Sequence, residues 1–214
     1  MIILGVSILG SFILLDKFAF GEFGISQPIM AGTILGIVFG DIPSGILVGA
    51  GLQLIFLGGL PIGRDIPPDG QAAGIIGCAS FFIIRATHTM GQALSLALIL
   101  ALIASIFGGA LEIVARRFNE NLSRAFKHRD THIALYHLGG LGTAFIRNMC
   151  TISPFVLVSS LIPLPERFPA LAPAHFIIIG TGIGSAQALY LFFKRSSVPY
   201  IIIGGLCGLV LLVL

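Results

Sequence analysis

The chain has 214 residues, of which 56% are hydrophobic and only 10% are charged, and its mean hydropathy is +1.04. Soluble domains carry roughly 25% charged residues, so this composition excludes a water-soluble globular fold and predicts an integral membrane protein. The net charge of +3 does not indicate nucleic-acid binding, because five basic residues gather in the short stretch 116–131, a pattern that instead indicates membrane topology.

Apolar runs separated by polar breaks follow one another along the whole chain. They lie near residues 2–15, 28–40, 42–60, 71–84, 92–115, 138–163, 173–193 and 198–214. Because about 20 apolar residues are needed to cross a bilayer as a helix, the runs 42–60, 92–115 and 173–193 are long enough. The runs 28–40 and 71–84 are shorter and suit half-spans or re-entrant hairpins.

These runs predict an all-α polytopic membrane protein with re-entrant or broken segments in its N-terminal half. No linker rich in proline, serine or charge divides the sequence, so we expect a single membrane-embedded domain over residues 1–214. The excess of Lys and Arg in 116–131 and 194–197 places both stretches in the cytoplasm.

The stretch 116–131 also has an apolar face, on which Phe118 and Leu122 recur at helical spacing. It could therefore form a short amphipathic helix on the cytoplasmic surface, or act simply as a positively charged topological anchor. Glu112 lies four residues before Arg116, and we expect the two side chains to form an ion pair.

Glycines recur every four residues at 32, 36 and 40, and again at 45 and 49. This spacing puts small residues on one helix face and predicts close helix packing in lipid. Asp41 follows this first glycine series and precedes Pro43, so its carboxylate could either cap a helix or bind a ligand.

Polar residues interrupt the apolar pattern between positions 53 and 71. Gln53 lies within an apolar run, where its amide needs hydrogen-bond partners from another helix or a polar solute. The following stretch, GGLPIGRDIPPDGQAAG, cannot be a continuous helix. It is either a solvated loop in which Arg64 and Asp65 face water, or a segment that dips into the membrane. In the second case Asp69 and Gln71 could hold the hydroxyl groups of a polar solute.

Further polar candidates lie in the second half, where His137, Arg147 and Asn148 could form a polar face on a half-buried helix. Cys78, Cys150 and Cys207 stand alone in apolar surroundings and are interpreted as small apolar fillers. The sequence contains no zinc-ligand spacing, P-loop or nucleophile elbow, so we expect no metal and no cofactor.

Three stretches of the N-terminal half carry a family resemblance. ILLDKFAF, QPIMAGTILGIVFGDIPSGILVGAGLQLIFLGGLPIG and PPDGQAAGII resemble the IIC membrane subunit of the mannose/fructose/sorbose family of bacterial sugar phosphotransferase systems, most closely over residues 11–80. The resemblance implies a multi-pass inner-membrane subunit that pairs with a IID membrane subunit, in a trimeric assembly. It also implies elevator-like transport of a hexose, which the soluble IIA and IIB subunits phosphorylate, and a sugar site around the broken segments.

The first hypothesis is therefore a IIC-type sugar permease whose predicted substrate-binding residues are Gln53, Asp65, Asp69 and Gln71. A second hypothesis is a transport-inactive paralogue that anchors phosphotransferase partners at the membrane. It arises because the family usually has Glu in place of Gln53 and commonly Asn in place of Pro61. A third hypothesis is an unrelated secondary transporter with broken helices.

Overall fold

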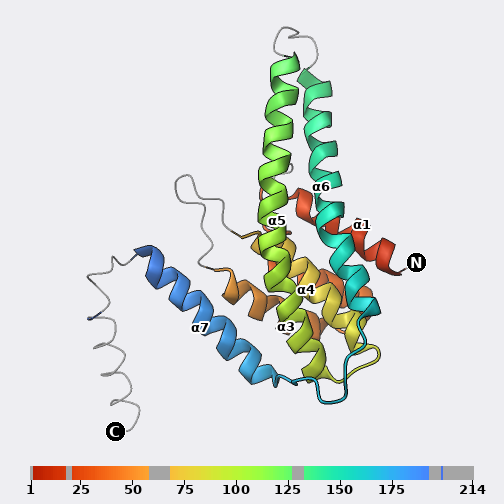
Figure 1. The fold of residues 1–214 in the computed structure, drawn as a ribbon, viewed down its shortest axis with the longest axis vertical. Coiled ribbons are helices and arrows are strands. Elements are labelled where there is room, and N and C mark those ends of the chain that lie inside the picture. The colour runs from red at the N-terminus through yellow and green to blue at the C-terminus, as the bar shows by residue number, and fades with distance from the viewer. Residues whose placement is uncertain (1, 18–20, 58–67, 127–132, 193–198, 200–214) are drawn as a thin grey trace.

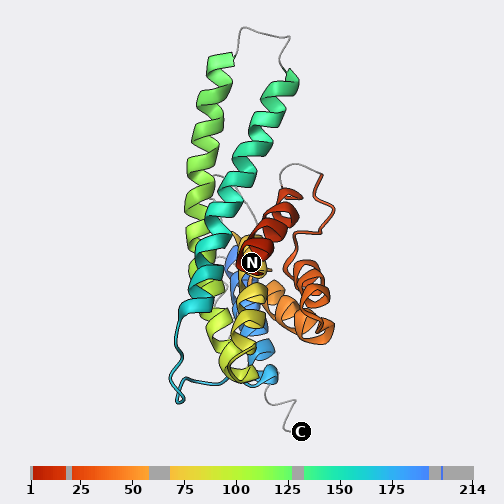
Figure 2. The same ribbon diagram turned by 90° about the vertical axis from the view of Figure 1, so that its right-hand side faces the viewer.

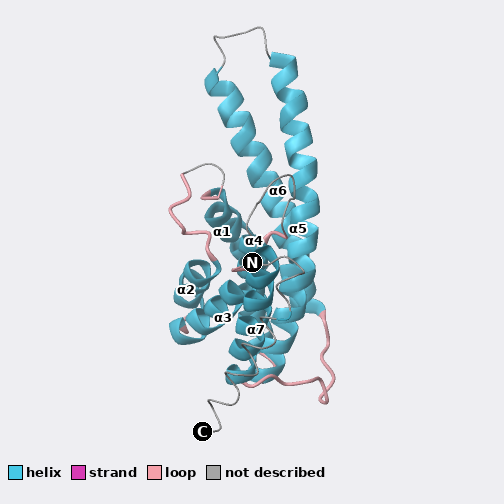
Figure 3. Cartoon of the chain, turned by 90° about the vertical axis from the view of Figure 1, so that its left-hand side faces the viewer, coloured by secondary structure: helices cyan, strands magenta, loops and turns pink. Residues whose placement is uncertain are grey.

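The computed structural model describes residues 2–17, 21–57, 68–126, 133–192 and 199, and every regular element within these ranges is an α-helix. The helices are α1 (Ile2–Leu15), α2 (Pro28–Phe39), α3 (Ile42–Ile55), α4 (Gly70–Arg85), α5 (Met90–Phe126), α6 (Ile133–Leu161) and α7 (Pro173–Phe192). The segment between α6 and α7, residues 162–172, is an irregular loop (Figure 3). The predicted all-α fold is confirmed for the described residues.

The first four helices are short: α1 has 14 residues, α2 has 12, α3 has 14 and α4 has 16. This length agrees with the half-spans predicted for 28–40 and 71–84. The run 42–60 was predicted to cross the membrane as one helix, and this was wrong, because α3 ends at Ile55 after 14 residues.

The α2–α3 hairpin has recognisable stop and start signals. Gly40 ends α2 in the left-handed conformation, with φ of +77°, which costs a glycine little. Asp41 then caps α3, because its carboxylate accepts a hydrogen bond from the backbone N–H of Ser44 at 3.1 Å. Of the two roles considered for Asp41, the structure shows the helix cap.

Glycines let α2 and α3 approach until their backbones touch. A Cβ atom built on Gly32 would collide with the carbonyl oxygen of Gly45, and one built on Gly45 would collide with the carbonyl oxygen of Gly32. A Cβ on Gly49 would lie 2.5 Å from the carbonyl oxygen of Pro28. The close packing predicted from the four-residue glycine spacing is confirmed.

We predict that Gly45→Ala destabilises the protein by roughly 1–3 kcal/mol, the usual cost of forcing extra atoms into a packed site. The atoms in the way belong to the backbone of α2 and cannot move aside as a side chain would. Thermal unfolding in detergent measures the effect, with Gly5→Ala as the matched control. A Cβ on Gly5 meets no atom within 4 Å, so its alanine variant should unfold at the same or a higher temperature.

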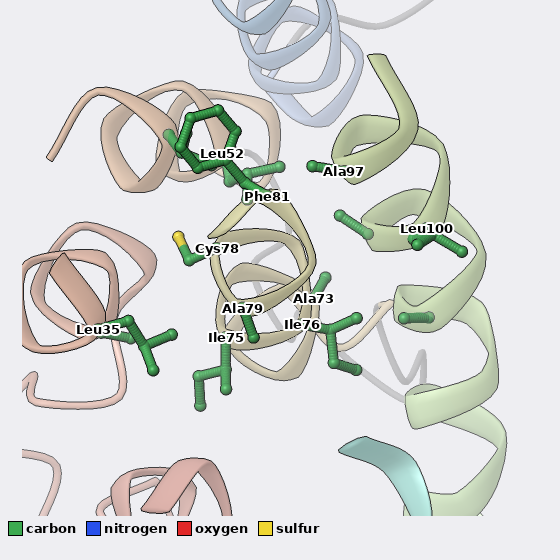
Figure 4. Packing of buried hydrophobic residues seen from close by; sticks show 14 of the residues in the cluster. Leu35, Leu52, Ala73, Ile75, Ile76, Cys78, Ala79, Phe81, Ala97 and Leu100 are labelled. Carbon is green, nitrogen blue, oxygen red and sulfur yellow. The ribbon is translucent and has the colours of Figure 1, made fainter. Parts of the chain in front are cut away.

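Helix α4 lies at the centre of the fold. Every side chain from Ala72 to Phe82 is buried, and Figure 4 shows Leu35 of α2, Leu52 of α3 and Leu100 of α5 around it. Short helices and the long helix α5 therefore surround α4 along most of its length. The position of the first residues of α4 is consequently fixed by several neighbouring elements.

Helices α5 and α6 form a long hairpin that extends beyond the rest of the molecule (Figures 1 and 2). Their segments Met90–Leu122 and His137–Leu161 are long and apolar enough to cross a membrane. α5 has 37 residues and is about 55 Å long at 1.5 Å per residue, which exceeds a hydrocarbon core of about 30 Å. The separate amphipathic helix considered for 116–131 is not formed, because α5 continues without a break to Phe126.

Helix α7 packs against α3, again through glycine. Phe176 of α7 is fully buried against Gly51, and a Cβ atom on Gly180 would lie 2.7 Å from the carbonyl oxygen of Gly51. The C-terminal part of α3, which carries Gln53, is thereby held from the side opposite to α2.

Candidate functional site

The carboxylate of Asp69 lies at the start of α4 and is almost fully buried, with 2% of the residue exposed. One oxygen caps α4 by accepting the backbone N–H of Ala72 at 3.1 Å, and the same oxygen lies 3.0 Å from the ammonium of Lys17. The other oxygen forms an ion pair with Arg147 of α6. Asp69 therefore joins the end of α1, the start of α4 and the middle of α6.

Arg147 extends this arrangement to α5. Its Nη2 donates to the carbonyl oxygen of Gly108 at 3.1 Å and lies 3.4 Å from the carboxylate of Glu112. Its Nη1 donates to Oδ1 of Asn148 at 2.9 Å, and the amide of Asn148 in turn donates to the carbonyl oxygen of Ser11 in α1. The predicted pair between Glu112 and Arg116 is confirmed at 2.7 Å.

Counted over the described residues alone, the buried charges at the centre of this network balance. Asp69, Glu112 and Arg147 are buried and Lys17 is partly buried, so two carboxylates face two cations, whereas the side chain of Arg116 is largely exposed. An unpaired charge at such a depth would cost several kcal/mol, so each of the four side chains depends on its partners. We call these four residues, Lys17, Asp69, Glu112 and Arg147, the ion network.

Two glutamines near the start of α4 have amide oxygens that are buried and bonded to no described residue. Gln53 of α3 donates its amide N–H to the side-chain oxygen of Gln27 at 2.8 Å, but its own Oε1 accepts no hydrogen bond from the described residues. Oε1 of Gln71, in the first turn of α4, is in the same state. Leaving such an acceptor buried and unbonded costs about 1–3 kcal/mol, which a hydrogen-bond donor from a bound molecule could offset.

The ends of three short helices meet around these glutamines. A Cβ atom on Gly70 would lie 2.6 Å from Cβ of Phe56, so the end of α3 contacts the start of α4. A Cβ on Gly74 would lie 2.5 Å from Cβ of Pro28, so the start of α2 contacts the first turns of α4. The segments that carry Gln27, Gln53 and Gln71 are thus neighbours in space.

Three of the four predicted site residues can be placed. Gln53 and Gln71 lie on neighbouring helix ends, each with an unbonded acceptor, as a site for a polar solute requires. Asp69 lies next to them, but its two oxygens are already occupied by Lys17, Ala72 and Arg147. Asp65, together with Arg64, lies outside the described residues.

Sequence reasoning missed the parts played by Lys17 and Gln27 and saw Arg147 only as part of a polar face. Lys17 and Arg147 lie 52 and 78 positions from Asp69 in the chain, so no local pattern links them. The positions of Lys17 and Asp69 at the borders of apolar runs could have indicated their pairing, because a charge buried in a membrane protein needs a partner.

The polar groups around the start of α4 differ in what they offer to a solute. The two free acceptors suit hydroxyl donors, whereas the charged groups beside them are engaged with one another. Within the described residues no cluster of His, Cys, Asp and Glu could hold a metal ion. The chemistry available here is recognition by hydrogen bonding.

Comparison with known families gives a match over almost the entire chain. The family described as the PTS system sorbose-specific IIC component matches residues 1–212. The sorbose-specific EIIC component of Klebsiella pneumoniae is 25% identical over 197 residues, covering 87% of this chain and 72% of the relative. The mannose-specific EIIC component of Escherichia coli K12 is 30% identical over 139 residues, covering 64% of this chain. That alignment spans half the length of the mannose relative.

Two solved structures share the fold. One, described as the structure of a membrane protein, has a TM-score of 0.66 at 23% identity and aligns with 97% of this chain and 85% of its own. The other, the mannose transporter ManYZ in complex with microcin E492, has a TM-score of 0.58 at 24% identity, with the same coverage. These similarities support the all-α membrane fold.

Proposed function

The chain belongs to the PTS sorbose-specific IIC family, and from that premise we propose that it is a permease subunit for a hexose of the mannose, fructose or sorbose type. In this proposal the sugar crosses the membrane through this chain and is phosphorylated by partner subunits. The family membership confirms the predicted resemblance and excludes an unrelated secondary transporter.

The observation that carries the proposal is the pair of free amide oxygens on Gln53 and Gln71. A hexose presents several hydroxyl groups, each of which can donate one hydrogen bond to such an oxygen. We propose that both glutamines contact the sugar directly. Asp69 acts beside them by holding the start of α4, and Asp65 remains a predicted contact outside the described residues.

The proposed partners are a IID-type membrane subunit and soluble IIA and IIB subunits, in a trimeric assembly within the bacterial inner membrane. The similarity in fold to the mannose transporter ManYZ supports a membrane partner. The two helices long enough to cross a bilayer, together with the shorter apolar helices, support a multi-pass position. Phosphoryl transfer belongs to the soluble subunits in this scheme, and this chain is not an enzyme.

An uptake assay tests the proposal. Vesicles that contain this chain and its IID-type partner should accumulate labelled D-mannose, D-fructose or L-sorbose as the sugar phosphate when the soluble subunits and phosphoenolpyruvate are present. Omitting phosphoenolpyruvate should abolish accumulation, and a sodium or proton gradient should not replace it. A gradient-driven uptake without phosphoryl donor would overturn the proposed coupling.

The same assay decides the transport-inactive alternative. A regulatory paralogue would retain the soluble subunits in a pull-down from vesicles but would accumulate none of the three sugars. Retention of the subunits together with accumulation of sugar phosphate supports the permease.

A further inference from the structure

Two adjacent residues after α1 connect to both halves of the candidate site by separate routes. Asp16 is buried, with 4% of the residue exposed, and its side chain faces the segment that leads into α2. Lys17 points to the start of α4, where its ammonium contacts Asp69 at 3.0 Å. The two free glutamine acceptors lie at the ends of these two routes.

The route from Asp16 runs through the loop before α2. Its carboxylate accepts hydrogen bonds from the backbone N–H of Phe23 at 2.9 Å and from the N–H and hydroxyl of Ser26 at 3.2 and 3.3 Å. Its carbonyl oxygen accepts the N–H of Glu22 at 3.1 Å. The residue after Ser26 is Gln27, whose side-chain oxygen holds the amide of Gln53.

This loop needs external support because its backbone is unfavourable at Glu22. Gly21 and Gly24 have positive φ, which glycine adopts readily, but Glu22 also has a positive φ of +54°, a conformation that residues other than glycine rarely adopt. Such a conformation persists only where surrounding contacts hold it, and the contacts from Asp16 are of that kind. Loss of the carboxylate would release the loop and with it the position of Gln27.

The route from Lys17 runs through the helix cap. Asp69 accepts Lys17 and the N–H of Ala72 with the same oxygen, so the ion pair and the cap of α4 share one atom. Gln71 lies in the first turn after this cap. Moving Asp69 would therefore turn the start of α4 and displace Oε1 of Gln71.

We infer that Asp16 and Lys17 are positioning residues of the sugar site, in which Asp16 orients Gln53 through the 21–27 loop and Gln27, and Lys17 orients Gln71 through Asp69. The inference rests on the proposed function. Neither residue needs to touch the sugar, because both act on the glutamines that do.

The sugar affinity of double variants tests this arrangement. Substitutions at independent residues multiply their fold-changes in Kd, whereas substitutions at coupled residues do not. The sample is the chain purified with its IID-type partner, and the probe is whichever of D-mannose, D-fructose and L-sorbose the wild type binds. Asp16→Ala and Lys17→Met should each raise the Kd at least fivefold. Lys17→Arg should keep the Kd within about twofold of the wild-type value, since it keeps the positive charge.

The pairs carry the decisive result. Adding Asp16→Ala to Gln53→Leu should change the Kd of that single variant by no more than about twofold. Adding it to Gln71→Leu should instead give a fold-change in Kd equal to the product of the two single fold-changes. Lys17→Met should show the reverse pattern, with no further loss beside Gln71→Leu and a multiplied loss beside Gln53→Leu. A general loss of stability would not distinguish between the two glutamines.

The results distinguish a failure of the positioning roles from a failure of the proposed function. If the wild type binds none of the three sugars, or Gln53→Leu and Gln71→Leu leave the Kd unchanged, the proposed function fails. If both glutamine variants weaken binding but every pair multiplies alike, the function stands and the positioning roles are overturned. Asp16→Asn, which keeps one acceptor oxygen, replaces Asp16→Ala in the same pairs should the alanine variant not assemble.

Discussion

Replacing Asp69 with asparagine should destabilise the protein by roughly 3–5 kcal/mol, the typical cost of removing one partner from a buried ion pair. The variant keeps the shape of the side chain and one acceptor oxygen for the cap on Ala72, but it removes the negative charge between Lys17 and Arg147. Removing one negative charge would leave the ion network more positive, with Glu112 as its remaining described carboxylate. The cost arises from burying that excess charge.

Unfolding can be followed through the chain's own thiols. Cys78 is fully buried, so a thiol-reactive dye should label it only as the protein unfolds, provided that Cys150→Ser and Cys207→Ser remove the other two thiols. Glu120→Gln is the matched control, because Glu120 pairs with Arg124 at an exposed site. Exposed pairs contribute about 0–1 kcal/mol, so this variant should unfold close to the wild-type temperature.

A second substitution separates charge balance from other effects at Asp69. Combining Asp69→Asn with Lys17→Met removes one negative and one positive charge, leaving Arg147 paired with Glu112. The double variant should therefore be more stable than Asp69→Asn alone, although it lacks one more native side chain. A further loss of stability in the double variant would contradict the charge-balance explanation.

Much of the fold follows from local patterns in the sequence. The four-residue spacing from Gly32 to Gly49 predicts the close α2–α3 packing because it depends only on which residues share a helix face. The end of α3 and the continuation of α5 were harder to foresee. No proline or glycine interrupts the chain between Ala115 and Phe126, and the pairs from Glu112 to Arg116 and Glu120 to Arg124 stabilise a continuing helix.

The candidate site, too, could be predicted from the sequence only in part. Gln53 and Gln71 were identified because an amide within an apolar pattern needs a partner, and that argument requires no tertiary contact. The occupation of Asp69 by Lys17 and Arg147 depends on the meeting of three helices distant in sequence. A sequence can show that a buried carboxylate needs cations, but only the fold shows which cations lie next to it.

Gln71→Leu should weaken sugar binding by roughly 5–150-fold, which corresponds to the loss of one buried hydrogen bond worth about 1–3 kcal/mol. The effect on stability should have the opposite sign. Oε1 of Gln71 is buried and has no partner among the described residues, so replacing the amide with an apolar side chain removes a cost in the sugar-free protein. The melting temperature should stay unchanged or rise while the Kd increases.

Gln92→Leu is the control that should show the reverse pattern. Gln92 lies in the first turn of α5, near the C-terminal end of α4 and away from Gln71. Its side-chain oxygen accepts a hydrogen bond from the hydroxyl of Thr89, and its amide N–H donates to the carbonyl oxygen of Glu166. Its replacement leaves these groups unpaired and should lower the melting temperature without changing the Kd for the sugar. A structural glutamine and a ligand-binding glutamine thus differ in which of the two measurements changes. If Gln71→Leu instead lowered the melting temperature and left the Kd unchanged, Gln71 would be a structural residue and the site would lie elsewhere.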